Sequence, residues 1–194
     1  MSHPLRCRCG TLTGSVREPQ RASRGVCYCK DCQAFARYLG KADTVLDAMG
    51  GTDVVATLPK YVSFTSGTGS LACLSLTDRG LLRWYATCCN TPIGNTSRDF
   101  RVPYVGLVHT CLGALAAIEA SFGPVRLRVN TQSANGRPKL MPLSTATALL
   151  RFAPTVILSR LDGSYRATPF FSADGIPIAQ RKVLTRTERE AAAS

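Results

Sequence analysis

The sequence predicts a mainly β protein with peripheral helices, an α+β fold, and three observations support this class. Residues 1–115 contain short strand-like runs that alternate with turn residues. Residues 116–194 show more helical periodicity. Apolar residues make up 45% of the chain, enough for a buried core. We therefore expect a core over 1–115 and a more helical extension over 116–194, packed together as one folded unit.

The expected strands are runs rich in β-branched and aromatic residues. Gly67, Gly69 and the turn at 78–80 separate several of them. The runs cover residues 11–16, 24–29, 53–58, 61–65, 71–77, 81–86, 104–109 and 125–129.

The first helix is predicted by apolar positions at i, i+3, i+4 and i+7. These positions are Cys32, Phe35, Ala36 and Leu39. Asp31 can cap the start of this helix, and Gly40 can end it.

Further helices are expected in and before the extension. One covers about 112–122 and stops at Gly123. Two more, 143–152 and 154–161, are separated at Pro154, because proline suits the first position of a helix. Thr185 and Glu188 match a capping box for a terminal helix.

The sequence predicts neither a membrane span nor secretion. Prolines and arginines interrupt the most apolar stretch, 140–161, and the N-terminal residues contain no apolar signal core. We therefore expect a cytoplasmic protein, in a reducing compartment where disulfides are rare. In a secreted chain the nine cysteines would instead suggest a disulfide framework with one thiol left over.

The charge of the chain is strongly basic, with 24 basic and 12 acidic residues and a formal net charge of +12. Such a balance favours carboxylates, phosphates or nucleic acid as partners. The basic residues are scattered, so we expect a solvated basic surface in preference to a nucleic-acid site. The sharper alternative is bidentate pairing of arginine with a substrate carboxylate, and Arg24, Arg98 and Arg101 lie near the cysteine motifs. The densest basic stretch contains Arg181, Lys182, Arg186 and Arg189.

Seven of the nine cysteines fall into tight groups, which is the pattern that metal binding needs. In an extended chain, residues i and i+2 face the same way, so a Cys-x-Cys pair offers two thiolates to one side. Gly10 allows a tight turn after the first pair, and the start of a helix favours the thiolate of Cys32. The groups are Cys7 and Cys9, then Cys27, Cys29 and Cys32, then Cys88 and Cys89.

These seven cysteines divide into a closed site of four and an open site of three. Structural zinc takes four protein ligands, whereas catalytic zinc takes three and keeps one position open. The simplest partition places Cys7, Cys9, Cys88 and Cys89 in the closed site and Cys27, Cys29 and Cys32 in the open one. We expect zinc, two ions per chain, and an iron–sulfur cluster is the alternative.

Other chemically notable residues are expected to be structural. Cys73 and Cys111 are assigned to the core. His109 is expected to be a partly buried histidine with satisfied hydrogen bonds, with a ligand or acid–base role as the alternative, and His3 is expected at a mobile terminus. The aromatic residues Trp84, Tyr85, Phe170 and Phe171 are expected to pack in the core.

The three motifs in this order resemble the glutathione-dependent formaldehyde-activating enzyme family, which includes centromere protein V-like proteins. Members share Cys-x-Cys-Gly, then Cys-x-Cys-x-x-Cys, then Cys-Gly-Thr-Pro. Here the first two motifs match without gaps, and the third has Asn90 in place of glycine. The resemblance covers about residues 5–112 and implies a zinc-bearing β-tent fold of small antiparallel sheets.

The third motif departs from the family pattern at one cysteine. The family usually has a cysteine three residues before this motif, where this chain has Ala86, and Cys88 lies beside Cys89 instead. Both can reach one zinc if the chain turns between them, and the Thr91-Pro92 pair suggests such a turn. Alternatively, Cys88 reaches the other zinc and closes the site of Cys27, Cys29 and Cys32.

The resemblance implies a carbon–sulfur lyase that uses a thiol co-substrate such as glutathione. Zinc held by Cys27, Cys29 and Cys32 would bind the thiol, and the thiolate would add to formaldehyde or leave an S-hydroxymethyl adduct. The rival expectation is a non-catalytic, zinc-stabilised module that binds an acidic protein or nucleic acid. A third expectation is a scaffold whose partner docks on the helical extension.

Overall fold

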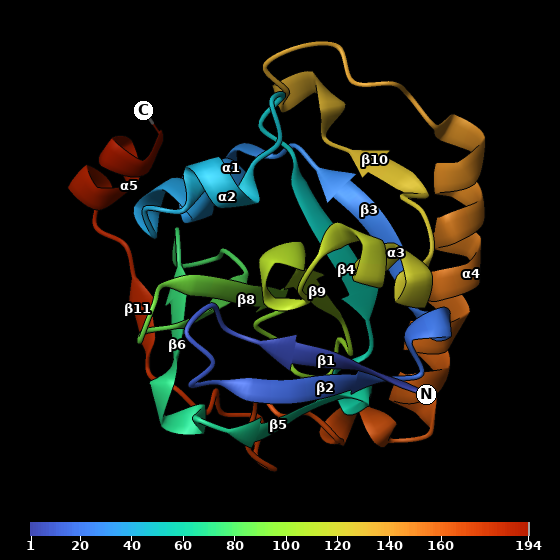
Figure 1. Cartoon of the computed structure of the whole chain (residues 1–194). Coiled ribbons are helices and arrows are strands. Elements are labelled where there is room, and N and C mark those ends of the chain that lie inside the picture. The colour runs from blue at the N-terminus through green and yellow to red at the C-terminus, as the bar shows by residue number, and fades with distance from the viewer. Residues whose placement is uncertain (194) are drawn as a thin grey trace.

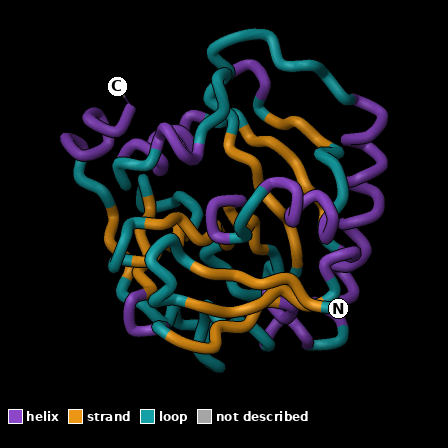
Figure 2. The backbone as a smooth tube through the Cα atoms, in the orientation of Figure 1, coloured by secondary structure: helices purple, strands orange, loops and turns teal. Residues whose placement is uncertain are grey.

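A computed structural model gives the fold of the chain and describes residues 1–193 (Figure 1). The protein is mainly β, with two sheets and several helices, so the predicted fold class is confirmed. Figure 2 shows the strands gathered in the middle of the molecule and the longer helices at its periphery.

The smaller sheet is antiparallel and has the strand order β1-β2-β5. It consists of β1 (Ser2–Arg6), β2 (Thr13–Arg17) and β5 (Val62–Ser66). Strand β1 was not predicted, and its Pro4 is tolerated because β1 lies at the sheet edge. His3 was expected at a mobile terminus, but it is buried in β1. Its ring nitrogens contact the Ser121 hydroxyl (2.8 Å) and the Leu112 carbonyl (2.7 Å).

The larger sheet has eight strands in the order β10-β3-β4-β9-β8-β7-β6-β11. Both edge strands come from the C-terminal part of the chain and pair in parallel, β10 with β3 and β11 with β6. All other pairs are antiparallel. The strands are β3 (Ser23–Cys27), β4 (Thr52–Thr57), β6 (Leu71–Ser75), β7 (Leu82–Ala86), β8 (Thr91–Thr96), β9 (Val105–Val108), β10 (Leu127–Val129) and β11 (Arg181–Val183).

Strand β8 was missed because the Thr91-Pro92 pair suggested a turn. The turn lies just before it, at 87–90, where Asn90 has a positive φ of 53°. Pro92 is accepted inside the sheet because the ladder with β7 shifts register beside it. The ladder with β9 begins only at Gly94.

The main core lies between the two sheets. Residues paired across strands share a face, so Val55, Leu107 and Trp84 all point toward the smaller sheet, where they meet Leu5 and Val16. Phe170 and Phe171 from the extension join this core, as expected for aromatic residues. The rings of Phe170 and Trp84 lie 5.2 Å apart.

The helices are α1 (Lys30–Tyr38), α2 (Ala42–Val45), α3 (Leu115–Phe122), α4 (Pro142–Leu161) and α5 (Arg186–Ala193). Helix α1 covers the other face of the large sheet, where Phe35 and Leu39 pack on Leu74. The predicted capping box of α5 is confirmed. The Glu188 N–H donates to the Thr185 hydroxyl (3.2 Å), and the Thr185 N–H donates to the Glu188 carboxylate (2.8 Å).

Two helix predictions are wrong. Helix α1 is capped by Cys29, whose sulfur accepts the Cys32 N–H at 3.4 Å, and not by Asp31, which lies in the first turn. The two helices expected around Pro154 form one continuous helix, α4. Proline removes its own N–H donor and its ring crowds the carbonyl of the preceding turn, but packing along β10 and the 3₁₀ turn at 164–166 keeps both halves in line. None of the helices in residues 1–193 is long and apolar enough to cross a membrane.

Candidate metal centres

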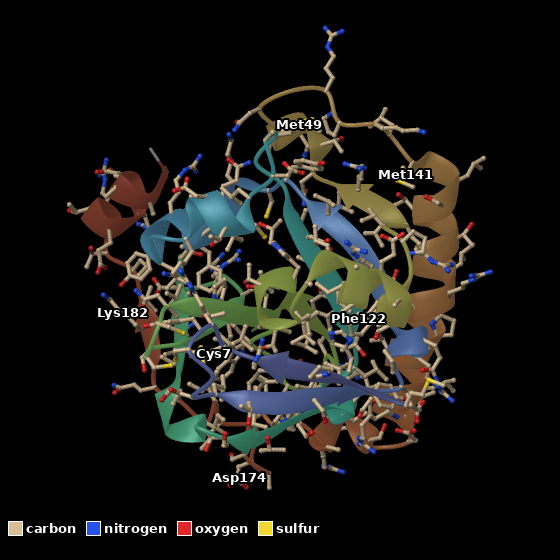
Figure 3. All side chains as sticks on the ribbon, viewed as in Figure 1. Cys7, Met49, Phe122, Met141, Asp174 and Lys182 are labelled. Atoms are coloured by element: carbon tan, nitrogen blue, oxygen red, sulfur yellow. The ribbon has the colours of Figure 1, made fainter. Side chains whose placement is uncertain are left out.

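Two loops bring four cysteines together, and we call them the four-cysteine cluster: Cys7, Cys9, Cys88 and Cys89. The first pair lies where β1 turns into β2, and the second pair lies where β7 turns into β8. Figure 3 labels Cys7 beside the end of β1. The loops fold this way because Gly10 and Asn90 adopt positive φ angles of 81° and 53°. Asparagine tolerates this conformation better than other non-glycine residues, so it can stand where the resembled family has glycine.

The sulfur positions of this cluster fit a tetrahedral metal. The Cys9 and Cys88 sulfurs are 3.3 Å apart, and Cys7 lies 3.5 Å from Cys9 and 3.7 Å from Cys88. Zn–S bonds of about 2.3 Å in a tetrahedron separate the sulfurs by about 3.8 Å. The distances are far too long for disulfides, and all nine cysteines are free thiols. Cys88 therefore belongs to this cluster and does not close the other one.

Hydrogen bonds in part of the four-cysteine cluster favour thiolates, whereas burial and contacts with the other cysteines raise the pKa of Cys88 to about 12. The Leu12 N–H donates to the Cys7 sulfur (3.3 Å). The hydroxyl and N–H of Thr11 lower the pKa of Cys9 to about 6, with smaller contributions from Cys88 and Cys7. The Thr91 hydroxyl lies 3.0 Å from the Cys89 sulfur. A metal ligand must be deprotonated, so these contacts prepare the cluster for a cation.

The three-cysteine cluster consists of Cys27, Cys29 and Cys32, whose sulfurs lie within 4.8 Å of one another. Cys27 ends β3, Cys29 caps α1, and Cys32 lies in the first turn of that helix. In residues 1–193 no fourth cysteine, histidine or carboxylate joins this group. Three protein donors are the composition of an open metal site, in which a fourth position is left for another ligand.

The three sulfurs share their protons. Hydrogen bonds from the Cys29 and Cys32 thiols lower the pKa of Cys27 to about 2. Their hydrogen bonds with Cys27, together with burial, raise the pKa values of Cys29 and Cys32. One thiolate is thus stabilised by two neighbouring thiols, and a soft divalent cation would take the place of their protons.

A buried arginine, which the sequence did not single out, lies against this cluster. The Arg83 side chain is 3% exposed and its Nη1 lies 3.9 Å from the Cys32 sulfur. The same nitrogen donates to the Asn95 side-chain oxygen at 3.1 Å, and the guanidinium lies over the Phe35 ring. Its carboxylate contact within the described residues is the solvent-exposed Asp31, at 3.5 Å. The buried guanidinium therefore lies between the Cys32 sulfur and one exposed carboxylate.

Two further residues surround the cluster. The Asn130 side chain donates to the Cys27 sulfur (3.4 Å) from a backbone with a φ of 55°. Burial raises the pKa of the Tyr104 phenol to about 12, and the nearby charges of Cys32 and Cys27 raise it further. The signal for Arg83 was present in the sequence as a single charge inside the apolar strand 81–86, but Asn130 carried no such signal.

The remaining candidates lie outside both clusters. Cys73 and Cys111 are buried, as expected, and burial raises the pKa of Cys73 to about 12. His109 Nδ1 lies 3.3 Å from the Asp53 carbonyl oxygen. Arg24 forms a buried ion pair with the Asp53 carboxylate (2.7 Å), and that contact raises its pKa. Two other arginines proposed from the sequence, Arg98 and Arg101, are exposed, and Arg98 donates to the Asp78 carbonyl (3.0 Å).

Fold and site together define a mainly β protein with two cysteine clusters that could each hold a metal ion. The chain belongs to a family of unknown function, DUF6151, whose sequence profile matches residues 1–181. The match includes both clusters and the edge strand β10, and it ends at the first residue of the other edge strand, β11. No curated protein matches the chain.

Proposed function

We propose that the chain is a zinc protein whose three-cysteine cluster acts on adducts of a thiol, such as glutathione, with a small aldehyde. The observation that carries this proposal is the unequal number of sulfurs in the two clusters. Four cysteines are the composition of a structural zinc site, and three are that of a catalytic one. The resemblance of residues 5–112 to formaldehyde-activating enzymes supports the same activity.

Arg83 gives the three-cysteine cluster its preference for an anionic sulfur. Zinc bound there would take a substrate thiol as a thiolate. Three cysteine thiolates and a fourth from substrate carry two more negative charges than a divalent cation neutralises. The buried guanidinium of Arg83, 3.9 Å from the Cys32 sulfur, compensates part of this excess. Asn130 steadies the opposite sulfur, Cys27.

The proposed reaction is cleavage of a carbon–sulfur bond. In an S-hydroxymethyl thioether the C–S bond breaks and its electron pair remains on sulfur. The hydroxyl loses its proton as the carbonyl forms, so the products are a thiolate, formaldehyde and a proton. The reverse reaction condenses the same partners. Stabilising the thiolate, which Arg83 does, lowers the energy of the charge that develops on sulfur.

The test combines metal coordination with catalysis. Zinc-edge absorption of the purified protein should report one four-sulfur zinc and one zinc with three sulfurs, and glutathione should raise the second to four. The protein should accelerate exchange between formaldehyde and S-hydroxymethylglutathione, measured by ¹³C NMR. Cys32→Ser should abolish both effects, whereas Cys73→Ser, which changes a buried thiol outside both clusters, should keep them.

Two closed four-sulfur sites that ignore glutathione, with no change in exchange rate, would overturn the proposal. The rival function, a zinc-stabilised module for an acidic partner, would then be tested by salt-sensitive retention on DNA or RNA.

A further inference from the structure

A cavity of about 530 Å³ lies beside the four-cysteine cluster. This volume falls in the range of about 300–1,000 Å³ that is typical of small-molecule sites. Its walls come from the end of β1, the start of β8, α2 and the segment that leads into α3. Pro92 and Leu115 give it an apolar portion, and Thr44 adds a hydroxyl.

Three cationic residues line the cavity, two from the stretch around Cys7 and one from the start of α2. Arg6 and Arg8 flank Cys7 on one wall, and Lys41 comes from the start of α2. Within residues 1–193 none of the three side chains forms an ion pair, and no acidic residue lines the cavity. Like charges that converge on one hollow repel each other and create a positive potential inside it.

We infer that this cavity binds a small, multiply charged oxyanion that bears phosphate or several carboxylate groups. Two arginines offer the planar forks that pair with such oxygens, and the lysine adds a third charge from the facing element. The apolar residues Pro92 and Leu115 would hold the organic part of the ligand. This charge arrangement is distinct from a solvated basic surface, because the cations surround a hollow.

The cavity is separate from the three-cysteine cluster. An adjoining smaller cavity shares Thr44 and His109 with it and is lined by Val26. Successive residues of a strand point to opposite faces, so Cys27, the next residue of β3, lies on the other side of the sheet. The inference therefore does not depend on the proposed catalytic activity.

The alternative role of Arg6 and Arg8 is to neutralise the charge of a metal-loaded four-cysteine cluster. A zinc ion with four thiolates carries a net charge of −2, and Arg6 and Arg8 flank one of its ligands. If they only neutralise that charge, their removal should destabilise the metal site. Lys41 lines the cavity from the start of α2 and does not flank a cysteine. A variant that changes both Lys41 and Arg8 therefore separates ligand binding from neutralisation of the metal site.

The experiment is isothermal titration calorimetry of the zinc-loaded chain with pyrophosphate, adenosine monophosphate and citrate at matched ionic strength. The first two probe phosphate ligands and the third probes carboxylates. We expect saturable binding of at least one probe, with one site per chain. The Arg8→Gln/Lys41→Gln variant should weaken it about ten-fold or more.

The matched control is Arg79→Gln/Lys139→Gln, which removes the same charge from exposed positions outside the cavity. It should change affinity by no more than about two-fold. Zinc content and thermal midpoint are measured for every variant. The inference is overturned if no probe saturates or if the control loses as much affinity as the cavity variant. It is also overturned if the cavity variant loses zinc while its zinc-loaded fraction binds the probe normally.

Discussion

The two cysteine clusters use different parts of the fold, although both are made of short cysteine motifs. The four-cysteine cluster joins a loop of the smaller sheet to a loop of the larger one, across about 80 residues of sequence. The three-cysteine cluster lies entirely within residues 27–32, where one strand passes into one helix. A metal in the first cluster would cross-link the sheets, whereas a metal in the second would tie together only neighbours.

This difference separates a stabilising role from a chemical one. Closing a long loop removes more conformational freedom from the unfolded chain than closing a short one. The four-cysteine cluster has the four ligands of a structural metal site, and these ligands come from two distant parts of the chain. The three-cysteine cluster has a buried cation beside it and one ligand fewer. The predictions below test whether stability and chemistry divide between the clusters in this way.

The largest expected effect is the loss of the fold when the four-cysteine cluster is broken. A structural zinc contributes about 10–16 kcal/mol of apparent binding free energy in peptides, as much as the roughly 5–15 kcal/mol that holds a whole domain together. Cys7→Ser, at a fully buried position, should abolish cooperative thermal unfolding monitored by near-ultraviolet circular dichroism.

The matched comparison is Cys27→Ser, which should retain a cooperative transition and lose only one zinc per chain. Cooperative unfolding of Cys7→Ser at the wild-type midpoint would contradict the structural role of the four-cysteine cluster.

The next effect concerns the order in which metal leaves. Ligands on a strand end and a helix start can separate without parting the sheets, so the three-cysteine cluster should release zinc first. A chromophoric chelator should remove zinc in two phases, and the fast phase should be absent from Cys32→Ser. Unfolding should accompany only the slow phase. A single phase that coincides with unfolding would mean that both metals hold the fold equally.

A smaller effect is expected at Arg83, whose buried guanidinium contacts the Cys32 sulfur of the three-cysteine cluster. A hydrogen bond to a charged group contributes about 1.5–3 kcal/mol, so Arg83→Met should weaken glutathione binding roughly 10- to 100-fold. Arg83→Lys keeps the charge and should restore part of the affinity. Titration of zinc-edge absorption with glutathione measures both. Equal losses of affinity in the two variants would show that Arg83 acts through the packing of its planar guanidinium and not through its charge.

Local sequence signals predicted the clusters better than they predicted the surroundings. Cysteine spacing indicated both groups, because each motif places its sulfurs within a few residues. It could not decide where Cys88 goes, since that depends on the turn at 87–90, in which Asn90 adopts a positive φ of 53°. The core strands were found from their composition. Strand β8 was missed because Pro92 and Gly94 are unusual inside a strand, and it forms because it pairs with a neighbouring strand on each side.

Long-range pairing explains the remaining gaps. Arg83 meets Cys32 only because α1 covers the face of β7 on which Arg83 lies. Asn130 meets Cys27, 103 residues away in sequence, because β10 pairs in parallel with β3. Pro154 was expected to end a helix, a local rule that the packing of α4 overrides. None of these contacts has a signature within a short window of sequence.

The smallest expected effects come from a matched pair of hydrogen bonds, one beside each cluster. Asn130→Gly removes the donor to Cys27 and tolerates the positive φ of 55° at this position. Loss of such outer contacts typically weakens metal binding about ten-fold or more, and chelator competition should detect this for one zinc. Thr91→Val removes the hydroxyl that contacts the Cys89 sulfur and accepts the Arg8 N–H. That change should cost about 1–3 kcal/mol of unfolding free energy.

The two variants should affect different measured quantities, zinc affinity in one and the thermal midpoint in the other. Asn130→Gly should change the affinity of the weaker zinc and leave the thermal midpoint nearly constant. Thr91→Val should lower the midpoint by several degrees, at about 2–4 °C per kcal/mol for a chain of this size, and leave the weaker zinc unchanged. If the midpoint falls equally in both variants, the three-cysteine cluster also supports the fold, and the division between a structural and a chemical cluster fails.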